Sequence, residues 1–172
     1  MALEQKFVGL NPSYHDVKAF DCGKPDMNAY LARFAAKNMR LKLSMTWVLP
    51  AEDRVEEKKK TIAAYYTLAS STVTREEVPI NDQPPRYPVP VILLARLAVD
   101  KRFQGARLGE KTLVSALRRS VAITESGLPA IGIILDVLDS DALGFYHRYE
   151  LFRSFTDDPM RLFVPTKVAE QI

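Results

Sequence analysis

The stretch that decides the fold lies mid-chain and reads Arg96-Leu97-Ala98-Val99-Asp100-Lys101-Arg102-Phe103-Gln104-Gly105-Ala106-Arg107-Leu108-Gly109. The apolar run 91–99 predicts a strand, and the basic turn after it opens into an amphipathic helix beginning near Leu108. The first N–H groups of a helix have no intrahelical partner and lie at its positive end, so they bind anions. Gly105 lets the backbone approach a polyphosphate, and Arg102 and Arg107 add cations around it. The turn therefore predicts a pyrophosphate site.

Two familiar phosphate-binding motifs are absent. The chain has no G-x-G-x-x-G, and Glu110 follows Gly109 where a P-loop would have Lys and then Ser or Thr. The turn instead resembles the Q/R-x-x-G-x-G/A turn of the GCN5-related N-acetyltransferases (GNAT), which holds the pyrophosphate of acetyl-coenzyme A. Arg102, Gly105 and the following helix match it. Arg107 stands where the family has Gly or Ala, and as a first-turn helical residue it is expected to need no positive φ.

Composition narrows the class of protein. The 172 residues are 47% apolar, which predicts one compact domain over residues 1–172. We expect no membrane span and no secretory signal, because there is no run of 18 apolar residues and no basic-then-apolar leader. The single cysteine, Cys22, excludes an internal disulfide and favours the cytoplasm. No His or Cys cluster has metal-ligand spacing, so no metal is expected. The net charge of +3 is too mild to predict nucleic-acid binding alone.

Hydrophobic periodicity predicts the elements of the first half of the chain. Asp26 is the expected N-cap of a first helix, whose apolar residues recur at helical spacing: Met27, Tyr30, Leu31, Phe34 and Ala35. Strands are expected at 44–49 and 61–70, joined by a charged hairpin loop at 52–60. Five prolines within 76–90 exclude regular structure there and predict a stiff loop that leads into the central strand.

The second half of the chain alternates helices and strands. The helix over 108–122 is expected to turn five residues inward: Leu108, Leu113, Ala116, Leu117 and Val121. Residues 130–138 are nearly all apolar, which predicts a strand buried on both faces. Asp139 is the expected N-cap of a helix that continues to residue 149. Two short strands, 152–155 and 160–164, close the series.

A second motif follows the buried strand. Residues 139–152 resemble the N-x-x-A-x-x-F-Y-x-x-x-G-F segment of the same acetyltransferases, with matches at Ala142, Phe145, Tyr146 and Phe152. Asp139 replaces the usual Asn, and Glu150 or Leu151 replaces the usual Gly. Two motifs in the right order identify the chain as resembling the GNAT family. The resemblance implies a single-domain α/β (α+β) fold, with a mixed central sheet flanked by helices and a cofactor cleft between two splayed parallel strands.

Features outside the shared core resemble a narrower group, the acetyltransferase toxins of bacterial type II toxin–antitoxin pairs. Residues 20–31 resemble their F-x-C-G-x-x-x-L-N-x-[FY]-L opening, and residues 65–71 their Y-Y-x-L-x-S-S strand. Residues 88–100 resemble P-x-x-x-L-G-R-L-A-V-D with Ala95 in place of Gly, and residues 163–167 resemble F-x-P-T-K. The resemblance implies acetylation of the α-amino group of aminoacyl-tRNA, which blocks translation. It also implies a homodimer and a ribbon-helix-helix antitoxin, whose complex with the toxin binds operator DNA.

The resemblance also implies which residues contact acetyl-coenzyme A. Backbone groups of the strand are expected to pair with the pantetheine arm, and one N–H group can polarise the thioester carbonyl. The side chains of Leu97 and Val99 can lie in the core at the same time, because backbone and side chains face different neighbours. The implied contacts are Leu97, Ala98, Val99, Arg102, Gln104, Gly105, Ala106, Arg107, Leu108, Gly109, Asp139 and Phe145.

Tyr146 matches the tyrosine that donates a proton in this family. A phenol has a reference pKa of about 10, near that of a thiol, so it can protonate the departing thiolate. Without the resemblance, a tyrosine beside Phe145 on an amphipathic helix is most simply a half-buried core residue. Tyr149 is then a packing residue, and His147 points toward solvent. We assign no general base, because an α-amino group with a reference pKa of about 8 is partly neutral at cellular pH.

A tRNA substrate requires a basic surface. Arg33, Lys37 and Arg40 form a stripe of one sign at the end of the first helix and are the expected tRNA contacts, although each alone is typical of a solvated charge. Three functions remain open: a toxin that acetylates aminoacyl-tRNA, an acetyltransferase of small-molecule or protein amines, and a non-catalytic regulatory partner of a DNA-binding antitoxin.

Overall fold

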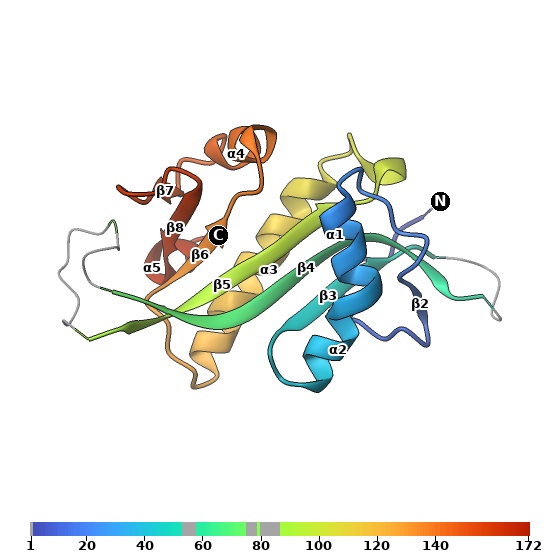
Figure 1. Ribbon diagram of the computed structural model, residues 1–172, viewed down its shortest axis with the longest axis horizontal. Coiled ribbons are helices and arrows are strands. Elements are labelled where there is room, and N and C mark those ends of the chain that lie inside the picture. The colour runs from blue at the N-terminus through green and yellow to red at the C-terminus, as the bar shows by residue number, and fades with distance from the viewer. Residues whose placement is uncertain (1, 53–57, 75–78, 80–86) are drawn as a thin grey trace. The chain divides into compact units, whose positions relative to one another are not determined.

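The structure is a computed structural model that describes residues 2–52, 58–74, 79 and 87–172. The chain forms two compact units, one of Met1–Leu68 with Arg96–Ser115 and the other of Ala69–Ala95 with Ala116–Ile172. Three long elements contribute to both units, namely β4 (Lys60–Val73), β5 (Val89–Val99) and α3 (Leu108–Glu125). They appear in Figure 1 as the two long green arrows and the long yellow helix.

The strands of the first unit are mostly antiparallel. The unit contains β1 (Val8–Gly9), β2 (His15–Asp16) and β3 (Met45–Pro50), with parts of β4 and β5, and β2 pairs parallel with β4. In the antiparallel pairings, Val8 lies opposite Val48, and Met45 lies opposite Leu68. Strand β4 combines β-branched and aromatic residues that suit a pleated surface, and it is continuously buried from Ile62 to Leu68.

A helical segment covers one face of these strands. It comprises α1 (Pro25–Ala29), a π-helical turn η1 (Tyr30–Phe34) and α2 (Ala35–Arg40), drawn in blue in Figure 1. Its inner side packs into a core cluster that contains Leu10, Phe20, Leu31, Ala35, Val48, Ile62, Tyr65 and Ala98. The phenol of Tyr65 donates a 2.7 Å hydrogen bond to the Met27 carbonyl, which fixes the helix against β4. Burial raises the pKa of Tyr65, because the buried site disfavours the phenolate.

Two sequence expectations about this helix are wrong. Lys24, not Asp26, is the N-cap; it makes no side-chain capping bond, and Pro25 occupies the first turn. Phe34, expected on the inner face, is exposed, whereas Leu31 and Ala35 are buried as expected. The π turn explains the difference, because the Ala35 N–H bonds to the Tyr30 carbonyl five residues earlier and the extra residue rotates the helix surface.

The second unit contains the parallel pairing of β5 with β6 (Gly132–Asp136), in which Ile92 lies opposite Ile133. Strand β8 (Arg161–Pro165) runs antiparallel to β6, and β7 (Arg153–Ser154) pairs with the outer side of β8. Two helices complete the unit, α4 (Ser140–His147) and α5 (Thr166–Ala169). Its core cluster contains Val73, Val89, Val91, Ile134, Phe155 and Phe163.

The mixed architecture predicted from the sequence is confirmed, with shifts at several boundaries. The strand expected over 130–138 is shorter, and the helix expected to reach residue 149 ends at His147. Strand β5 begins at Val89, so Pro90 lies inside a strand rather than in the stiff loop, at an exposed position near the strand end where proline is tolerated. Of the predicted inward residues of α3, four are buried and Val121 is half-buried.

Two loop predictions fall largely on residues that the structure does not describe. Residues 53–57 of the charged hairpin loop, and 76–78 and 80–86 of the proline-rich loop, lie outside the described residues. In the part of the chain that is described, no helix is long and apolar enough to cross a bilayer. The same part holds no group of three or more His, Cys, Asp or Glu residues placed to bind a metal ion.

Gly132 is closely packed against β8, so a substitution at this position tests the packing of the second unit. A Cβ atom at this position would lie 2.4 Å from two ring atoms of Phe163 and 2.7 Å from the Val164 carbonyl oxygen. We therefore expect Gly132→Ala to lower the free energy of unfolding by about 2–3 kcal/mol in urea titrations, because the buried ring has to move. Gly144→Ala is the matched control: its Cβ meets nothing within 4 Å and it lies in α4. Equal stability of the two variants would contradict the packing.

Candidate active site

The turn after β5 is organised around the carboxylate of Asp100. Asp100 is 1% exposed and caps the short 3-10 helix η2 (Lys101–Phe103) by accepting the Arg102 N–H at 2.9 Å. The Arg102 guanidinium folds back onto the same carboxylate, with Nε 2.9 Å from Oδ1 and Nη2 3.1 Å from Oδ2. A fourth bond comes from the Asp21 N–H, 3.0 Å from Oδ2. One buried acid thus holds the turn and the N-terminal segment together.

The electrostatics of this group follow from those contacts. Burial acts to raise the pKa of Asp100, but the hydrogen bonds from Arg102 and from the Asp21 amide outweigh it and hold the pKa below its usual value. Asp100 is therefore ionised wherever the protein functions near neutral pH. Arg102, expected as a cation around a pyrophosphate, has its guanidinium engaged by this acid.

Gln104 reinforces the same turn. Its side-chain Nε2 donates to the Val99 carbonyl at 2.9 Å and to the Cys22 carbonyl at 3.4 Å. The Lys101 N–H donates to the Asp21 carbonyl at 2.8 Å, which adds a backbone link to the N-terminal segment. The side chain of Gln104 therefore joins the end of β5 to the segment before α1.

The chain then reverses into α3 through two residues of positive φ. Gly105 has a φ of 94°, and a Cβ there would meet nothing within 4 Å, so the glycine is required by conformation rather than by space. Arg107 has a φ of 58° and precedes the helix, so the expectation that it lies in the first helical turn without a positive φ is wrong. A Cβ atom in this conformation costs about 1–2 kcal/mol, a cost that Gly at this position avoids and Ala does not.

The helix that follows offers unpaired backbone donors. The Lys111 N–H bonds to the Arg107 carbonyl at 3.1 Å, so the N–H groups of residues 108–110 precede the first intrahelical bond. Arg107 is exposed beside them, and the open space at Gly105 leaves the backbone accessible. A diphosphate fits this set of residues, because α3 is long, its dipole favours negative charge at this end, and one cation stands next to its first turn.

The three strand residues that are expected to contact acetyl-coenzyme A differ in how deeply they are buried. Ala98 is buried in the core cluster of the first unit, whereas Leu97 and Val99 are half-buried. The Val99 carbonyl already accepts the Gln104 amide. The core role expected for Leu97 and Val99 is therefore only partly met, and Ala98 is the buried side chain of the three.

The remaining predicted site residues belong to the second unit and surround α4. Asp139 caps this helix, as predicted, by accepting the Ala142 N–H at 2.9 Å. Tyr146 is buried, and its ring makes edge-to-face contacts with Phe145 at 5.0 Å and Phe152 at 5.6 Å between centroids. Burial raises the pKa of Tyr146, because the aromatic surroundings disfavour the phenolate. The phenol is therefore protonated at cellular pH.

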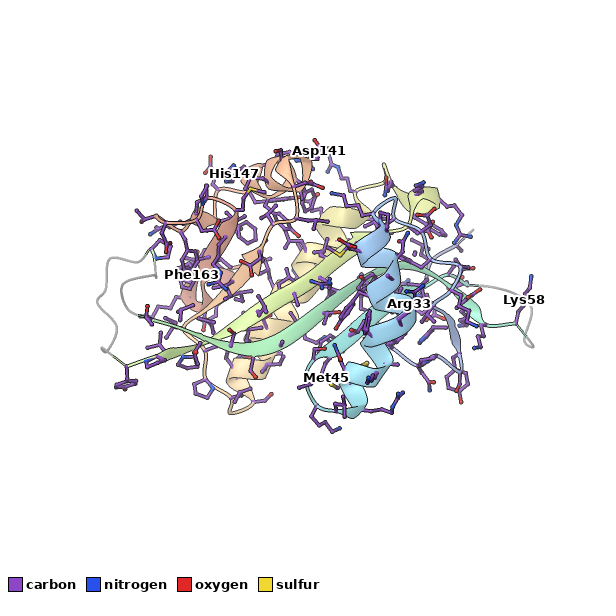
Figure 2. All side chains as sticks on the ribbon, in the orientation of Figure 1. Arg33, Met45, Lys58, Asp141, His147 and Phe163 are labelled. Atoms are coloured by element: carbon purple, nitrogen blue, oxygen red, sulfur yellow. The ribbon has the colours of Figure 1, made fainter. Side chains whose placement is uncertain are left out.

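The other predictions for α4 agree with the structure. His147 is exposed on the outer side of the helix, where Figure 2 labels it together with Asp141. Tyr149 is half-buried, and its ring lies 5.6 Å from that of Phe145. The side chain of Arg148 stacks over the Phe145 ring at 5.2 Å. Phe145 therefore sits between three neighbours that fix its orientation, and it is itself half-buried.

The predicted tRNA contacts lie in the first unit. Arg33 comes from the π turn, and Lys37 and Arg40 come from α2; all three are exposed. Figure 2 labels Arg33 on this helical segment. Sequence reasoning missed the role of Asp100, although the residue stands in the quoted R-L-A-V-D motif. An acid directly after an apolar strand and two residues before an arginine was the available signal.

Comparison with known proteins identifies the family. No family model matches the chain. The tRNA-acetylating toxin of Mycobacterium tuberculosis (strain H37Rv) is 34% identical over 160 residues, covering 91% of this chain and 90% of that protein. A crystal structure of a tyrosine-to-phenylalanine mutant of KacT matches with a TM-score of 0.87 and 25% identity, covering 99% of both chains. The chain belongs to the tRNA-acetylating toxins of the GNAT family.

A second solved neighbour shares the fold. AtaT complexed with acetyl-methionyl-tRNAfMet matches with a TM-score of 0.84 and 23% identity, covering 96% of this chain and 97% of that one. A mutant of AtaT was also solved with the C-terminus of the antitoxin AtaR and acetyl-coenzyme A, at a TM-score of 0.78 and 22% identity over 96% of both chains. The GNAT fold predicted from the two sequence motifs is confirmed.

The Asp100 contacts predict how stability responds to substitution and to acid. Asp100→Asn removes the charge that accepts four hydrogen bonds, and we expect the free energy of unfolding to fall by about 2–3 kcal/mol at pH 7. Because the folded-state pKa is lowered, the stabilisation is present above the unfolded value of about 4 and is lost as the pH falls below it. The gap between wild type and variant should therefore shrink in urea titrations at low pH.

Asp141→Asn is the control, because Asp141 is an exposed carboxylate on α4. A gap between Asp100→Asn and wild type that stays constant from pH 7 to pH 3 would contradict the assignment.

Proposed function

We propose that this chain transfers acetyl from acetyl-coenzyme A to the α-amino group of aminoacyl-tRNA, blocks translation and is neutralised by an antitoxin. The observation that carries the proposal is the extended identity to a tRNA-acetylating toxin, which covers nine-tenths of both proteins. The organised turn before α3 supports it, because its backbone donors and cation suit a diphosphate. The enzyme is an acetyl-coenzyme A-dependent N-acetyltransferase.

The residues of the turn have different roles in binding acetyl-coenzyme A, the acetyl donor. The N–H groups at the start of α3 (Leu108, Gly109) and the guanidinium of Arg107 bind the diphosphate, while Gly105 and Ala106 leave room for it. Arg102 and Gln104 position the turn, since both side chains bond to protein groups. The backbone of Leu97, Ala98 and Val99 pairs with the pantetheine arm. Asp139 and Phe145 complete the cofactor contacts.

Tyr146 is the catalytic acid. When the amine nitrogen attacks the thioester carbon, the carbon–sulfur bond breaks and the departing thiolate takes the phenolic proton. The raised pKa means that Tyr146 is protonated at cellular pH, so a proton is present when sulfur leaves. The α-amino group, with a reference pKa of about 8, supplies enough neutral amine at cellular pH without a protein base. Its last proton passes to water.

The partners follow from the same family membership. Arg33, Lys37 and Arg40 contact the phosphates of the tRNA substrate, because an exposed run of cations releases counterions on binding. The antitoxin is of the ribbon-helix-helix type, and its complex with this chain binds operator DNA. The toxin is a cytoplasmic homodimer. Complexes of the neighbour AtaT with an antitoxin segment and with an acetylated aminoacyl-tRNA support the tRNA and antitoxin assignments.

One incubation tests the function. Purified protein receives labelled acetyl-coenzyme A with total charged tRNA, and mass spectrometry identifies the acylated species. We expect label on the amino acid attached to tRNA, and a fall of about 10²–10⁴-fold in rate for Tyr146→Phe with acetyl-coenzyme A affinity retained. Tyr149→Phe is the matched control and should keep its rate. Label that appears only on protein or free amines would contradict the proposal and favour an acetyltransferase of those amines.

Two substitutions of Arg107 distinguish its role in cofactor binding from the strain of its backbone conformation. Arg107→Ala removes the cation and keeps the positive φ, whereas Arg107→Gly removes the cation and relieves the strain. We expect both variants to bind acetyl-coenzyme A about tenfold more weakly in calorimetry, through loss of one charge-assisted contact. In thermal unfolding, Arg107→Ala should match wild type, because it keeps the strain, and Arg107→Gly should be more stable than both. Arg118→Ala, at an exposed position of the same helix, is the control. Unchanged affinity in both Arg107 variants would contradict the assigned contact.

A further inference from the structure

His15 is a buried histidine of the first unit that the proposed mechanism does not use. Its side chain is 6% exposed, and it stands in β2, next to the start of β4 (Figure 1). Histidine is the side chain whose charge ordinarily changes between pH 5 and pH 8, so a buried histidine can make a structure respond to pH. The chain contains one other histidine, His147, which is exposed.

The ring of His15 closes a turn of residues 11–16, which we call the His15 turn. The Nδ1 atom of the ring accepts the Asn11 N–H at 3.0 Å, and the His15 N–H donates to the Asn11 carbonyl at 2.9 Å. The Ser13 N–H donates to the side-chain oxygen of Asn11 at 3.0 Å. Both backbone groups of Asn11 are therefore bonded to His15, one to its ring and one to its backbone.

The His15 turn connects the N-terminal segment to two strands. Before the turn, the Leu10 N–H bonds to the carbonyl of Thr46 in β3 at 2.9 Å. After the turn, β2 pairs in parallel with β4, where His15 lies opposite Lys60. The Lys60 N–H bonds to the Tyr14 carbonyl at 2.7 Å. The chain therefore passes from β3 to β4 at this turn, and the closed turn holds β2 against β4.

The bond between the His15 ring and Asn11 requires a neutral imidazole. A ring nitrogen that accepts a hydrogen bond carries no proton, whereas both nitrogens of an imidazolium ion are donors. A proton on Nδ1 would face the Asn11 N–H, donor against donor, and this bond would be lost. It would also place a positive charge at a position that is 6% exposed. Protonation of His15 is therefore incompatible with the closed turn.

Two charged groups of the described residues act on the ring from neighbouring segments. Glu4 of the N-terminal segment and Lys60 of β4 form an ion pair with each other. Burial lowers the pKa of His15, while Glu4 acts to raise it and Lys60 acts to lower it. In β2 itself, the Asp16 carboxylate accepts the Lys18 N–H at 3.2 Å. The closed turn therefore binds fewer protons than the open turn, and its stability falls as the pH drops below about 6.5.

We propose that the His15 turn is a pH-sensitive switch, which opens when His15 gains a proton and releases β2 from β4. Opening leaves the backbone of Lys60 and Thr61 without its partner strand. The change is local, because the next anchor along the chain is the bond from the Asp21 N–H to Asp100. The pKa of Asp100 is held below its usual value, so this anchor persists at pH 5. The turn before α3 therefore stays closed while the N-terminal segment opens.

The test is hydrogen exchange of individual amides, followed by NMR in the full chain without acetyl-coenzyme A or RNA, which keeps the result independent of the proposed function. Protection factors are corrected for the intrinsic effect of pH on exchange. In wild type we expect those of the Asn11, His15 and Lys60 amides to fall about tenfold from pH 7 to pH 5. The Asp21 amide should keep its protection. His15→Asn keeps an acceptor near the Nδ1 position but does not titrate, so its protection factors should not fall.

His147→Asn is the matched control, because it removes the other histidine from an exposed position of α4 and should behave like wild type. A wild-type titration of the His15 ring signals gives a second readout that does not depend on the folding of His15→Asn. We expect that ring to titrate with a pKa below the usual value of about 6.5. Four results would overturn the proposal: unchanged protection in wild type, an equal fall in His15→Asn, a fall that includes the Asp21 amide, or a ring pKa at or above the usual value.

Discussion

The carboxylate of Asp100 is the constraint on which the candidate donor site depends. It is buried at the end of β5. It accepts hydrogen bonds from the Arg102 amide, the Arg102 guanidinium and the Asp21 amide. A buried acid left without these partners would be strongly unfavourable, so the turn is held in the single conformation that satisfies it. Helix α3 begins a few residues after this turn. The conformation of the turn therefore sets the direction of the first N–H groups of α3.

The same constraint explains why an arginine tolerates a left-handed conformation at position 107. The backbone enters the turn fixed by Asp100 and Gln104 and leaves it fixed by the first intrahelical bond of α3, so the two residues of positive φ are determined from both sides. In the proposed mechanism, the strain holds a cation beside the diphosphate. Arg102, which matches the family motif, serves the turn itself.

The sequence was enough to predict the elements that have a strong hydrophobic periodicity, a continuous apolar run or a capping residue. The apolar run before Asp100, the helix from Leu108 and the Asp139 cap all appear in the structure. The failures arise where one residue changes the backbone path. The hydrophobic periodicity of the first helix does not predict the π turn that exposes Phe34. The positive φ of Arg107 depends on the conformation of the turn before it. The catalytic role proposed for Tyr146 rests on family resemblance, because burial alone makes the residue a core aromatic.

The most direct test of the central claim is a double-mutant cycle on acetyl-coenzyme A binding. Calorimetry would give the dissociation constants of wild type, Asp100→Asn, Arg102→Ala and the double variant at pH 7. If Arg102 acts through Asp100 to hold the turn, the two single variants weaken binding by similar factors and the double variant is no weaker than either. Losses that multiply in the double variant, or full affinity in Asp100→Asn, would contradict the claim.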